Sequence, residues 1–226
     1  NMAKKQQEDT KIKELEENYE HLHYNVREKL SNLPNILDKT VPIGKDEKDN
    51  KILKTVGKIP KFKFTPKDHT DLALNLNILD LERASKVTGA RFYYLKNELV
   101  TLNQALLNFA LDLLKKKKFT LVQPPYLLKK EAISGAITFS TFEDTIYKIE
   151  NEDLYLIGTA EHALNAYHLG DTINGEDLPL RFAGISPCFR KEAGAHGKDT
   201  KGIFRVHQFE KIEQFVFCKP EQAEKE

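Results

Sequence analysis

The N-terminal part of the chain combines a polar surface with one narrow apolar stripe. Its apolar residues alternate at spacings of three and four, as in the seam of a coiled coil: Ile12, Leu15, Tyr19, Leu22 and Val26. This pattern predicts a helix over residues 5–33, which ends where Pro34 removes a backbone donor. A narrow stripe needs a partner helix, and the sequence offers no second heptad run. The partner is either another subunit or, as we favour, the other helix of an antiparallel hairpin that the sequence enters partway.

A connector and two further helices are expected next. Residues 35–66 are rich in Lys, Asp, Pro and Gly, which indicates a long connector. A helix is expected over residues 71–87, closed by Gly89, with an apolar face made of Leu72, Leu76 and Leu79. A strand follows at residues 91–95. The clearest helical pattern spans residues 99–113, and its apolar positions are Leu99, Leu102, Leu106, Phe109 and Leu113.

Four lysines follow that helix at positions 115–118. Cations at a helix C-terminus complement the helix dipole, and we favour this interpretation over a nucleic-acid site. Strands are predicted at residues 119–123 and 154–157, and the second leads into Gly158-Thr159-Ala160-Glu161 and another helix. On physical grounds alone, Thr159 suits a helix cap, with Glu161 favourable in the first turn.

The most informative pattern is a predicted β-hairpin made of residues 180–192 and 204–218. Alternate side chains of a strand share one face. The hairpin therefore directs two arginines, two carboxylates and one aromatic ring toward a common site, from Arg190, Glu192, Arg205, Phe209 and Glu213. The opposite face carries residues that suit a core, Val206, Ile212 and Val216. Such a charged face indicates either a ligand site or ordinary cross-strand ion pairs.

The scarcity of arginine favours the ligand site. Only six of the 35 Lys and Arg residues are Arg, so lysine supplies most of the positive charge. Arg190 and Arg205 lie at the predicted site, where a planar guanidinium suits a carboxylate or a phosphate. The alternative to a ligand site is that the lysine bias reflects an AT-rich genome and that the arginines are placed at random.

Size and composition set outer bounds. A chain of 226 residues can bury one substantial core and carry an appendage, and its net charge of +1 names no partner. No apolar run approaches the roughly 18 residues of a membrane span, so no membrane association is expected. Cys188 and Cys218 lack the spacing of a zinc site and are too few for a disulfide framework. A reduced, cytoplasmic protein is expected.

Several segments together resemble the seryl-tRNA synthetases, a family of class II aminoacyl-tRNA synthetases. The run FRKEAGAHGKDTKGIFRVHQFEKIE at residues 189–213 is similar to motif 2 of that family, and Gly158–Glu161 is similar to its serine-binding loop. The long helix, the following strand and Pro124 resemble motif 1, which forms the dimer interface of class II enzymes. The resemblance implies an α+β fold, in which helices flank an antiparallel sheet and part of a coiled-coil arm lies at the N-terminus.

The resemblance also implies how the chain is divided. Residues 1–34 correspond to the returning helix of the tRNA-binding arm, residues 35–66 to a linker, and residues 67–226 to a partial catalytic domain with motifs 1 and 2. The first arm helix and motif 3 are not recognised in the sequence. We therefore expect a portion of the enzyme that is incomplete by itself.

The implied function is that of a serine–tRNA ligase, which uses ATP to activate L-serine as seryl-adenylate and transfers the seryl group to tRNA(Ser). Arg190 is the implied catalytic residue, which bridges the α-phosphate and the serine carboxylate. The implied serine-binding residues are Thr159, Ala160, Glu161, Arg190 and Glu213. The implied ATP-binding residues are Arg190, Lys191, Glu192, Arg205, Val206 and Phe209. Magnesium is expected with ATP, without protein ligands in this chain, and a homodimer is expected through motif 1.

Two other functions remain open at this point. A non-catalytic or repurposed relative would bind tRNA or charge another carrier, although the intact set of site residues opposes it. Another class II synthetase, for threonine or proline, predicts a different motif 2 loop and no Thr-Ala-Glu segment. No catalytic role is expected for the histidines, because none has the partners of a triad or a metal site: His162, His196 and His207.

Overall fold

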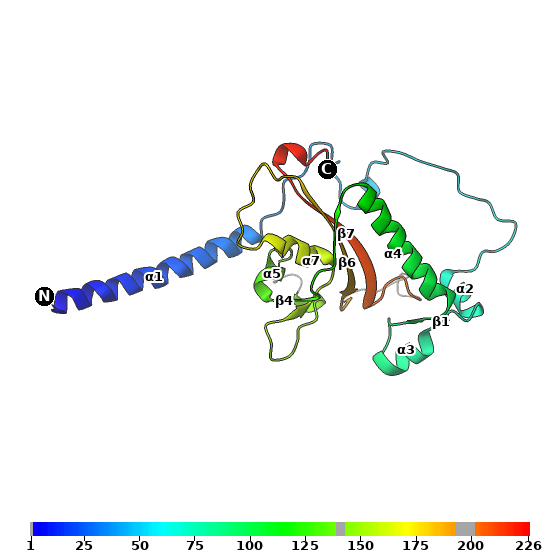
Figure 1. The fold of residues 1–226 in the computed structure, drawn as a ribbon, viewed down its shortest axis with the longest axis horizontal. Helices are drawn as coiled ribbons and strands as arrows, with labels where there is room; N and C mark the ends of the chain where they lie inside the picture. The colour runs from blue at the N-terminus through cyan, green and yellow to red at the C-terminus, as the bar shows by residue number, and fades with distance from the viewer. Residues whose placement is uncertain (1, 139–142, 193–201) are drawn as a thin grey trace. The chain divides into compact units, whose positions relative to one another are not determined.

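The computed structural model describes residues 2–138, 143–192 and 202–226. Two compact units divide the chain, Asn1–Lys63 and Phe64–Glu226. In the first unit, helix α1 (Met2–Ser31) is followed by the single 3-10 turn η1 (Glu47–Asp49) (Figure 1). The predicted N-terminal helix is confirmed, and it begins and ends slightly earlier than the periodicity indicates.

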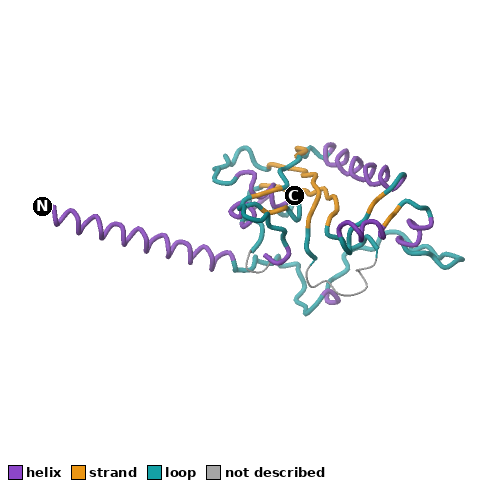
Figure 2. The backbone as a smooth tube through the Cα atoms, turned by 90° about the horizontal axis from the view of Figure 1, so that it is seen from below, coloured by secondary structure: helices purple, strands orange, loops and turns teal. Residues whose placement is uncertain are grey.

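The apolar stripe of α1 lies open within its own unit. Its five members are all exposed, namely Ile12, Leu15, Tyr19, Leu22 and Val26. The connector is also confirmed, because residues 32–68 contain no helix or strand apart from η1 and run as loop in Figure 2. No helix in the described part of the chain is long and apolar enough to cross a membrane.

The second unit mixes short helices with three small sheets. Its helices are α2 (His69–Asn75), α3 (Leu81–Thr88), α4 (Glu98–Lys116), α5 (Lys130–Ser134) and α7 (Ala160–Asn165), with 3-10 turns η2 (Glu143–Thr145), η3 (Ala166–His168) and η5 (Pro220–Gln222). Its strands are β1 (Leu79–Asp80), β2 (Tyr94–Leu95), β3 (Thr120–Val122), β4 (Leu127–Leu128), β5 (Tyr155–Leu156), β6 (Leu180–Phe189) and β7 (Gln208–Phe217). The predicted α+β class is confirmed.

The single helix predicted over residues 71–87 is wrong, because the segment folds as α2, β1 and α3. Asn77 adopts the left-handed region at φ 54°, which ends α2. Asp80 then caps α3, and its Oδ1 accepts from the backbone N–H of Arg83 at 2.9 Å. The expected common apolar face is therefore lost: Leu79 is only 3% exposed, whereas Leu72 and Leu76 are exposed.

Strands β6 and β7 form the hairpin that organises this unit. They pair antiparallel from Leu180↔Phe217 to Phe189↔Gln208, and β3 joins β6 in parallel. Helix α7 packs against β6 and β7, while α4 contacts β3 and β7 (Figure 1). The predicted helix over residues 99–113 is confirmed as α4, with Lys115 and Lys116 in its last turn.

The hairpin is shorter than predicted at its open end. Residues 190–192 and 204–207, which the sequence analysis placed in strands, lie outside β6 and β7. Glu192 adopts φ 49°, a left-handed conformation that cannot continue a strand. The pairing extends by one step only, since the backbone N–H of Arg190 donates to the carbonyl of His207 at 2.9 Å. The loop expected between the two strands covers residues 193–202, of which 193–201 lie outside the described residues.

One face of the hairpin is divided into an apolar half and a charged half. Near the start of β6, Phe215 and Phe217 pack against a buried cluster made of Ala160, Leu164 and Phe182. Phe209 and Glu213 lie farther along the same face of β7, toward its N-terminal end. The opposite face was expected to feed a core: Val206 is buried, and Ile212 and Val216 are half-buried. On the face covered by α7, apolar packing therefore stabilises the end of the sheet near the start of β6. The polar groups lie together at the opposite end.

Candidate active site

Arg190 is held at the end of β6 by contacts from two sides. Its Nε donates to the carbonyl of Gly158 at 3.0 Å, and its guanidinium carbon lies 5.3 Å from the centroid of the Phe209 ring. That separation is a cation–π contact. The backbone N–H of Phe189 also donates to the carbonyl of Ile157 at 2.9 Å, which fixes the segment before α7 beside the end of β6. Arg190 is therefore oriented before any ligand binds.

Thr159 and Glu213 meet at the N-terminus of α7. The hydroxyl of Thr159 donates to Oε2 of Glu213 at 2.6 Å and accepts from the backbone N–H of Glu161 at 3.3 Å. The expected capping role of Thr159 is confirmed, and the same hydroxyl also binds a carboxylate of β7. Lys211 adds an ion pair to Oε2 of Glu213 and donates to Thr159 at 3.3 Å.

A glycine in β6 permits this meeting of α7 and β7. Gly184 is the Cα partner of Glu213, and a Cβ built on Gly184 would lie 2.8 Å from side-chain atoms of Ala160 and Leu164. Only a residue without a side chain lets α7 approach so closely. The absent side chain at Gly184 is thus what brings Thr159 within reach of Glu213.

A second ion pair lies beside the first group. Arg205 Nη1 is 3.1 Å from Glu192 Oε2, and the carbonyl of Glu192 accepts from Arg91 at 3.2 Å. Two residues that the resemblance assigns to ATP, Glu192 and Arg205, therefore bind each other in the structure.

Two histidines contact the backbone of this group. The ring Nδ1 of His207 lies 2.8 Å from the carbonyl of Arg190, and the His207 ring lies 5.2 Å from that of Phe92. His162 Nδ1 accepts from the backbone N–H of Gly158 at 3.3 Å. Gly158 is thereby held by its N–H through His162 and by its carbonyl through Arg190. The described residues contain no group of three or more His, Cys, Asp or Glu that could hold a metal ion.

Acid is expected to destabilise the fold through His162. Burial lowers the pKa of His162 to about 4, and the nearby charges of Arg190 and Lys211 act in the same direction. The ordinary value is 6.5, so the unfolded chain binds the proton first. The free energy of unfolding should therefore fall as the pH drops from about 6.5 to about 4, by at most about 1.4 kcal/mol per pH unit from this group.

Urea unfolding at several pH values measures this effect. His162→Gln keeps an acceptor for Gly158 and should flatten the slope between those pH values. An unchanged slope in the variant would show that other groups cause the acid sensitivity.

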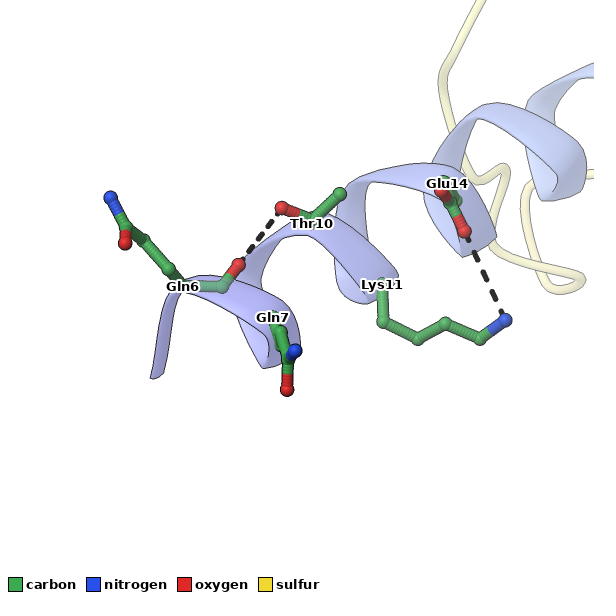
Figure 3. Close-up of a pocket in the computed structure, with 5 residues that line it drawn as sticks. All are labelled: Gln6, Gln7, Thr10, Lys11 and Glu14. Carbon is green, nitrogen blue, oxygen red and sulfur yellow. Dashed lines mark hydrogen bonds and ion pairs between the residues drawn. The ribbon is translucent and has the colours of Figure 1, made fainter. Parts of the chain in front are cut away.

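The surface hollow in Figure 3 is not part of this group. It has a volume of about 580 Å³ and is lined by one helix alone, through Gln6, Gln7, Thr10, Lys11 and Glu14 (Figure 3). Its only polar contacts among those residues are the Thr10 hydroxyl to the carbonyl of Gln6 and the ion pair of Lys11 with Glu14. The side chains of this groove all come from one solvated helix and do not converge on a common point. The polar groups at the end of the hairpin come from several elements and do converge.

Comparison with known proteins relates this chain to the aminoacyl-tRNA synthetases. The family described as "tRNA synthetase class II core domain (G, H, P, S and T)" matches residues 141–226. The serine–tRNA ligase of Nitrosopumilus maritimus is 55% identical over 213 residues, which are 94% of this chain and 49% of the relative. That of Archaeoglobus fulgidus is 51% identical over 216 residues, 87% of this chain and 48% of the relative. The chain belongs to the seryl-tRNA synthetase family.

Solved structures of seryl-tRNA synthetases share this fold. The enzyme of Pyrococcus horikoshii, crystallised with ATP, superposes with a TM-score of 0.89 at 47% identity, over 99% of this chain and 55% of that one. The cytoplasmic serine–tRNA ligase of Naegleria fowleri, crystallised with AMP, gives 0.81 at 40% identity, over 92% of this chain and 50% of that one. The chain spans about half the length of the relatives it matches.

The structure brings some residues suggested by the synthetase resemblance together and leaves others apart. It groups Thr159, Arg190, Phe209 and Glu213, and it pairs Glu192 with Arg205. Ala160 is fully buried against the sheet, Val206 is buried, and Glu161 is exposed. Lys191 is exposed, with Nζ 5.8 Å from the ring centroid of Tyr147.

Sequence reasoning about the synthetase site missed two contributors. Lys211 lies between Phe209 and Glu213 on the same face of β7. The alternation of side chains along a strand could therefore have identified it. The carbonyl of Gly158 could not be recognised, since a backbone acceptor leaves no mark on side-chain spacing. Both are parts of the group that the fold assembles.

Proposed function

We propose that this chain provides the amino-acid activation site of a serine–tRNA ligase. The proposal rests mainly on two contacts at one end of the hairpin. The guanidinium of Arg190 lies over the ring of Phe209, and the carboxylate of Glu213 accepts from the hydroxyl of Thr159. Arg190 suits a carboxylate or a phosphate, and Phe209 suits the face of adenine. The two similar structures were crystallised with ATP and with AMP, which supports a nucleotide at this site.

The proposed reaction has two steps. The ionised carboxylate of serine attacks the α-phosphorus of ATP, and pyrophosphate leaves. A ribose hydroxyl at the 3′ end of tRNA(Ser) then attacks the carbonyl carbon of seryl-adenylate, and AMP leaves. The first step needs no general base, because the carboxylate is already charged near pH 7. Its transition state gathers negative charge between the α-phosphate and the serine carboxylate, where Arg190 is oriented to stabilise it.

Glu213 and Thr159 are proposed to recognise serine. A half-buried carboxylate can accept from both the ammonium and the hydroxyl of the amino acid. Alanine would leave one of these bonds unmade, and sites built around a hydroxyl reject analogues that lack it by about 10⁴- to 10⁵-fold. Threonine must be excluded by the walls of the site, of which Ala160 and Gly184 form the packed base.

Magnesium is proposed to arrive with the triphosphate, whose negative charge it would neutralise. The described residues contain no cluster of three or more His, Cys, Asp or Glu that could hold a metal ion. No protein ligand is assigned to it among the described residues.

The remaining proposals concern location and partners. We propose that α1 belongs to an arm that contacts tRNA(Ser), since its exposed stripe suits pairing with a second helix. We also propose a cytoplasmic location and a homodimer through α4. The stripe on α4 that supports the dimer is exposed in the described unit and consists of Leu102, Leu106, Phe109 and Leu113.

Replacing Phe109 by glutamate is expected to dissociate this dimer. Phe109 is 69% exposed in the isolated chain, and a charge buried in an apolar interface without a partner is strongly unfavourable. Sedimentation velocity on the complete gene product should show a dimer for the wild type and a monomer for Phe109→Glu. Asn108→Glu, an exposed position of α4 outside the stripe, should stay dimeric. A dimeric Phe109→Glu would contradict the proposed interface.

Serine-dependent exchange of labelled pyrophosphate into ATP tests the function itself. The complete gene product should catalyse exchange with serine at least about 10³-fold more efficiently than with alanine, because sites that read a hydroxyl reject analogues that lack it. Threonine keeps the hydroxyl and is excluded only by the walls of the site, so its exchange should be about 10- to 200-fold less efficient. Exchange that depends on threonine or proline would identify another synthetase. No exchange, together with retained tRNA binding, would favour the non-catalytic alternative.

A further inference from the structure

Lys211 occupies a position that the proposed reaction does not explain. Its ammonium forms an ion pair with Oε2 of Glu213 and lies 3.3 Å from the hydroxyl of Thr159. The same Oε2 also accepts from Thr159 at 2.6 Å. Two groups, the ammonium of Lys211 on β7 and the hydroxyl of Thr159 before α7, thus meet at one carboxylate oxygen. The other oxygen, Oε1, receives no hydrogen bond from any residue in the described ranges.

We propose that Lys211 is a positioning residue for the amino-acid substrate: together with Thr159 it fixes Oε2 of Glu213, so that Oε1 remains as the acceptor for the substrate ammonium and hydroxyl. This inference rests on the proposed function. It assigns to Lys211 an indirect role, since Lys211 acts through Glu213 and does not touch the reacting atoms.

The contact differs from an ordinary strand ion pair in two ways. Lys211 and Glu213 are two residues apart on one face, which places their Cα atoms about 6.6 Å apart along an extended strand. Exposed pairs of this kind contribute little. Here, however, the side chains are only 35% and 20% exposed, and the ammonium also binds Thr159, which comes from a different element. A contact to two elements fixes the carboxylate in a way that a pair along one strand does not.

The space for this arrangement comes from the facing strand. Ser186 and Gly184 are the Cα partners of Lys211 and Glu213 in β6, and both are small and buried. A Cβ at Gly184 would lie 2.8 Å from side-chain atoms of Ala160 and Leu164, so this glycine lets α7 approach the sheet beside Glu213. Thr159, which precedes α7, therefore reaches the same carboxylate as Lys211.

A fixed acceptor matters because recognition depends on geometry. A misplacement of about 1 Å can reduce a rate by about 100-fold. Without the ammonium, Glu213 would keep only the bond from Thr159 and could rotate about it. The substrate would then meet an acceptor with several orientations, and its affinity would fall. Arg190 and the nucleotide contacts would be unchanged.

The test uses three variants of the complete gene product in serine-dependent pyrophosphate exchange. Lys211→Met keeps the stem and removes the charge, and Lys211→Arg keeps the charge. Lys86→Met is the matched control, since Lys86 also pairs with a glutamate, Glu82 at 2.7 Å, on the exposed helix α3. We expect Lys211→Met to raise the KM for serine about 10- to 100-fold, with the KM for ATP and kcat changed less than about threefold. Lys211→Arg should recover part of this loss, and Lys86→Met should match the wild type.

Each other result overturns the proposal. A lower KM for serine in Lys211→Met would show that Lys211 competes with the substrate ammonium instead of preparing its site. An equal rise in KM for serine and ATP, with a lower melting temperature, would show a purely structural role. Unchanged kinetics would show no role at all. A wild type without serine-dependent exchange would instead reject the proposed function, and the inference with it, before any variant is compared.

Discussion

Replacing Arg190 by alanine is expected to reduce kcat for serine-dependent pyrophosphate exchange by about 10³-fold, with a smaller change in the KM values. The loss of one preoriented group that stabilises transition-state charge costs about 10²- to 10³-fold, and Arg190 carries a full charge as well. Its orientation is set by the Gly158 carbonyl at 3.0 Å and the Phe209 ring at 5.3 Å. Steady-state exchange kinetics on the complete gene product measure the effect.

Replacing Arg190 by lysine distinguishes the contribution of the positive charge from that of the planar guanidinium geometry. Arg190→Lys keeps a cation but loses the planar fork, and with it the bond to Gly158. We expect it to remain within about tenfold of the alanine variant, because a point charge cannot serve two anionic groups as a fork does. Thermal melting of both variants should stay near that of the wild type. An alanine variant with more than a tenth of wild-type kcat would remove Arg190 from the reaction.

Replacing Glu213 by alanine is expected to abolish the preference for serine. The change deletes the proposed acceptor for the ammonium and hydroxyl, and it leaves the charge of Lys211 without its partner. Truncating one member of a hydrogen-bonded charge pair that is removed from water costs about 2–5 kcal/mol, which corresponds to a loss of about 30- to 5,000-fold in kcat/KM for serine. The ratio of kcat/KM values for serine and alanine should approach one.

A neighbouring glutamate provides the control. Glu210 lies on the opposite face of β7, is exposed and accepts weakly from Asn103 at 3.5 Å, so Glu210→Ala should leave exchange unchanged. Glu213→Gln should retain the shape of the side chain but not its charge, and should lose most of the serine dependence. Wild-type specificity in Glu213→Ala would remove this residue from recognition of serine.

Periodicity predicted the long elements and the grouping of charges on the hairpin. The α1 stripe, the α4 stripe and the alternation in β7 repeat over many residues, so tertiary contacts do not override them. The charged and aromatic residues of β7 lie together because every second residue faces the same way. These features are therefore properties of the local sequence.

The features that could not be predicted depend on single residues and on contacts distant in sequence. Asn77 and Glu192 adopt positive φ shortly after the ends of α2 and β6, within segments that side-chain periodicity would have continued as helix and strand. Thr159 and Glu213 are 54 positions apart, and their contact depends on the missing side chain of Gly184. The spacing of apolar and polar residues predicts neither the backbone conformation of a single residue nor the close approach of two elements.

A crystal structure of the complete gene product with a non-hydrolysable seryl-adenylate analogue tests the central claim most directly. The account predicts adenine on the Phe209 ring, the α-phosphate group and the seryl carbonyl at Arg190, and the seryl ammonium at Oε1 of Glu213, with Lys211 still on Oε2. An analogue bound elsewhere, or bound at the hairpin with Arg190 and Glu213 turned away from it, would contradict the account.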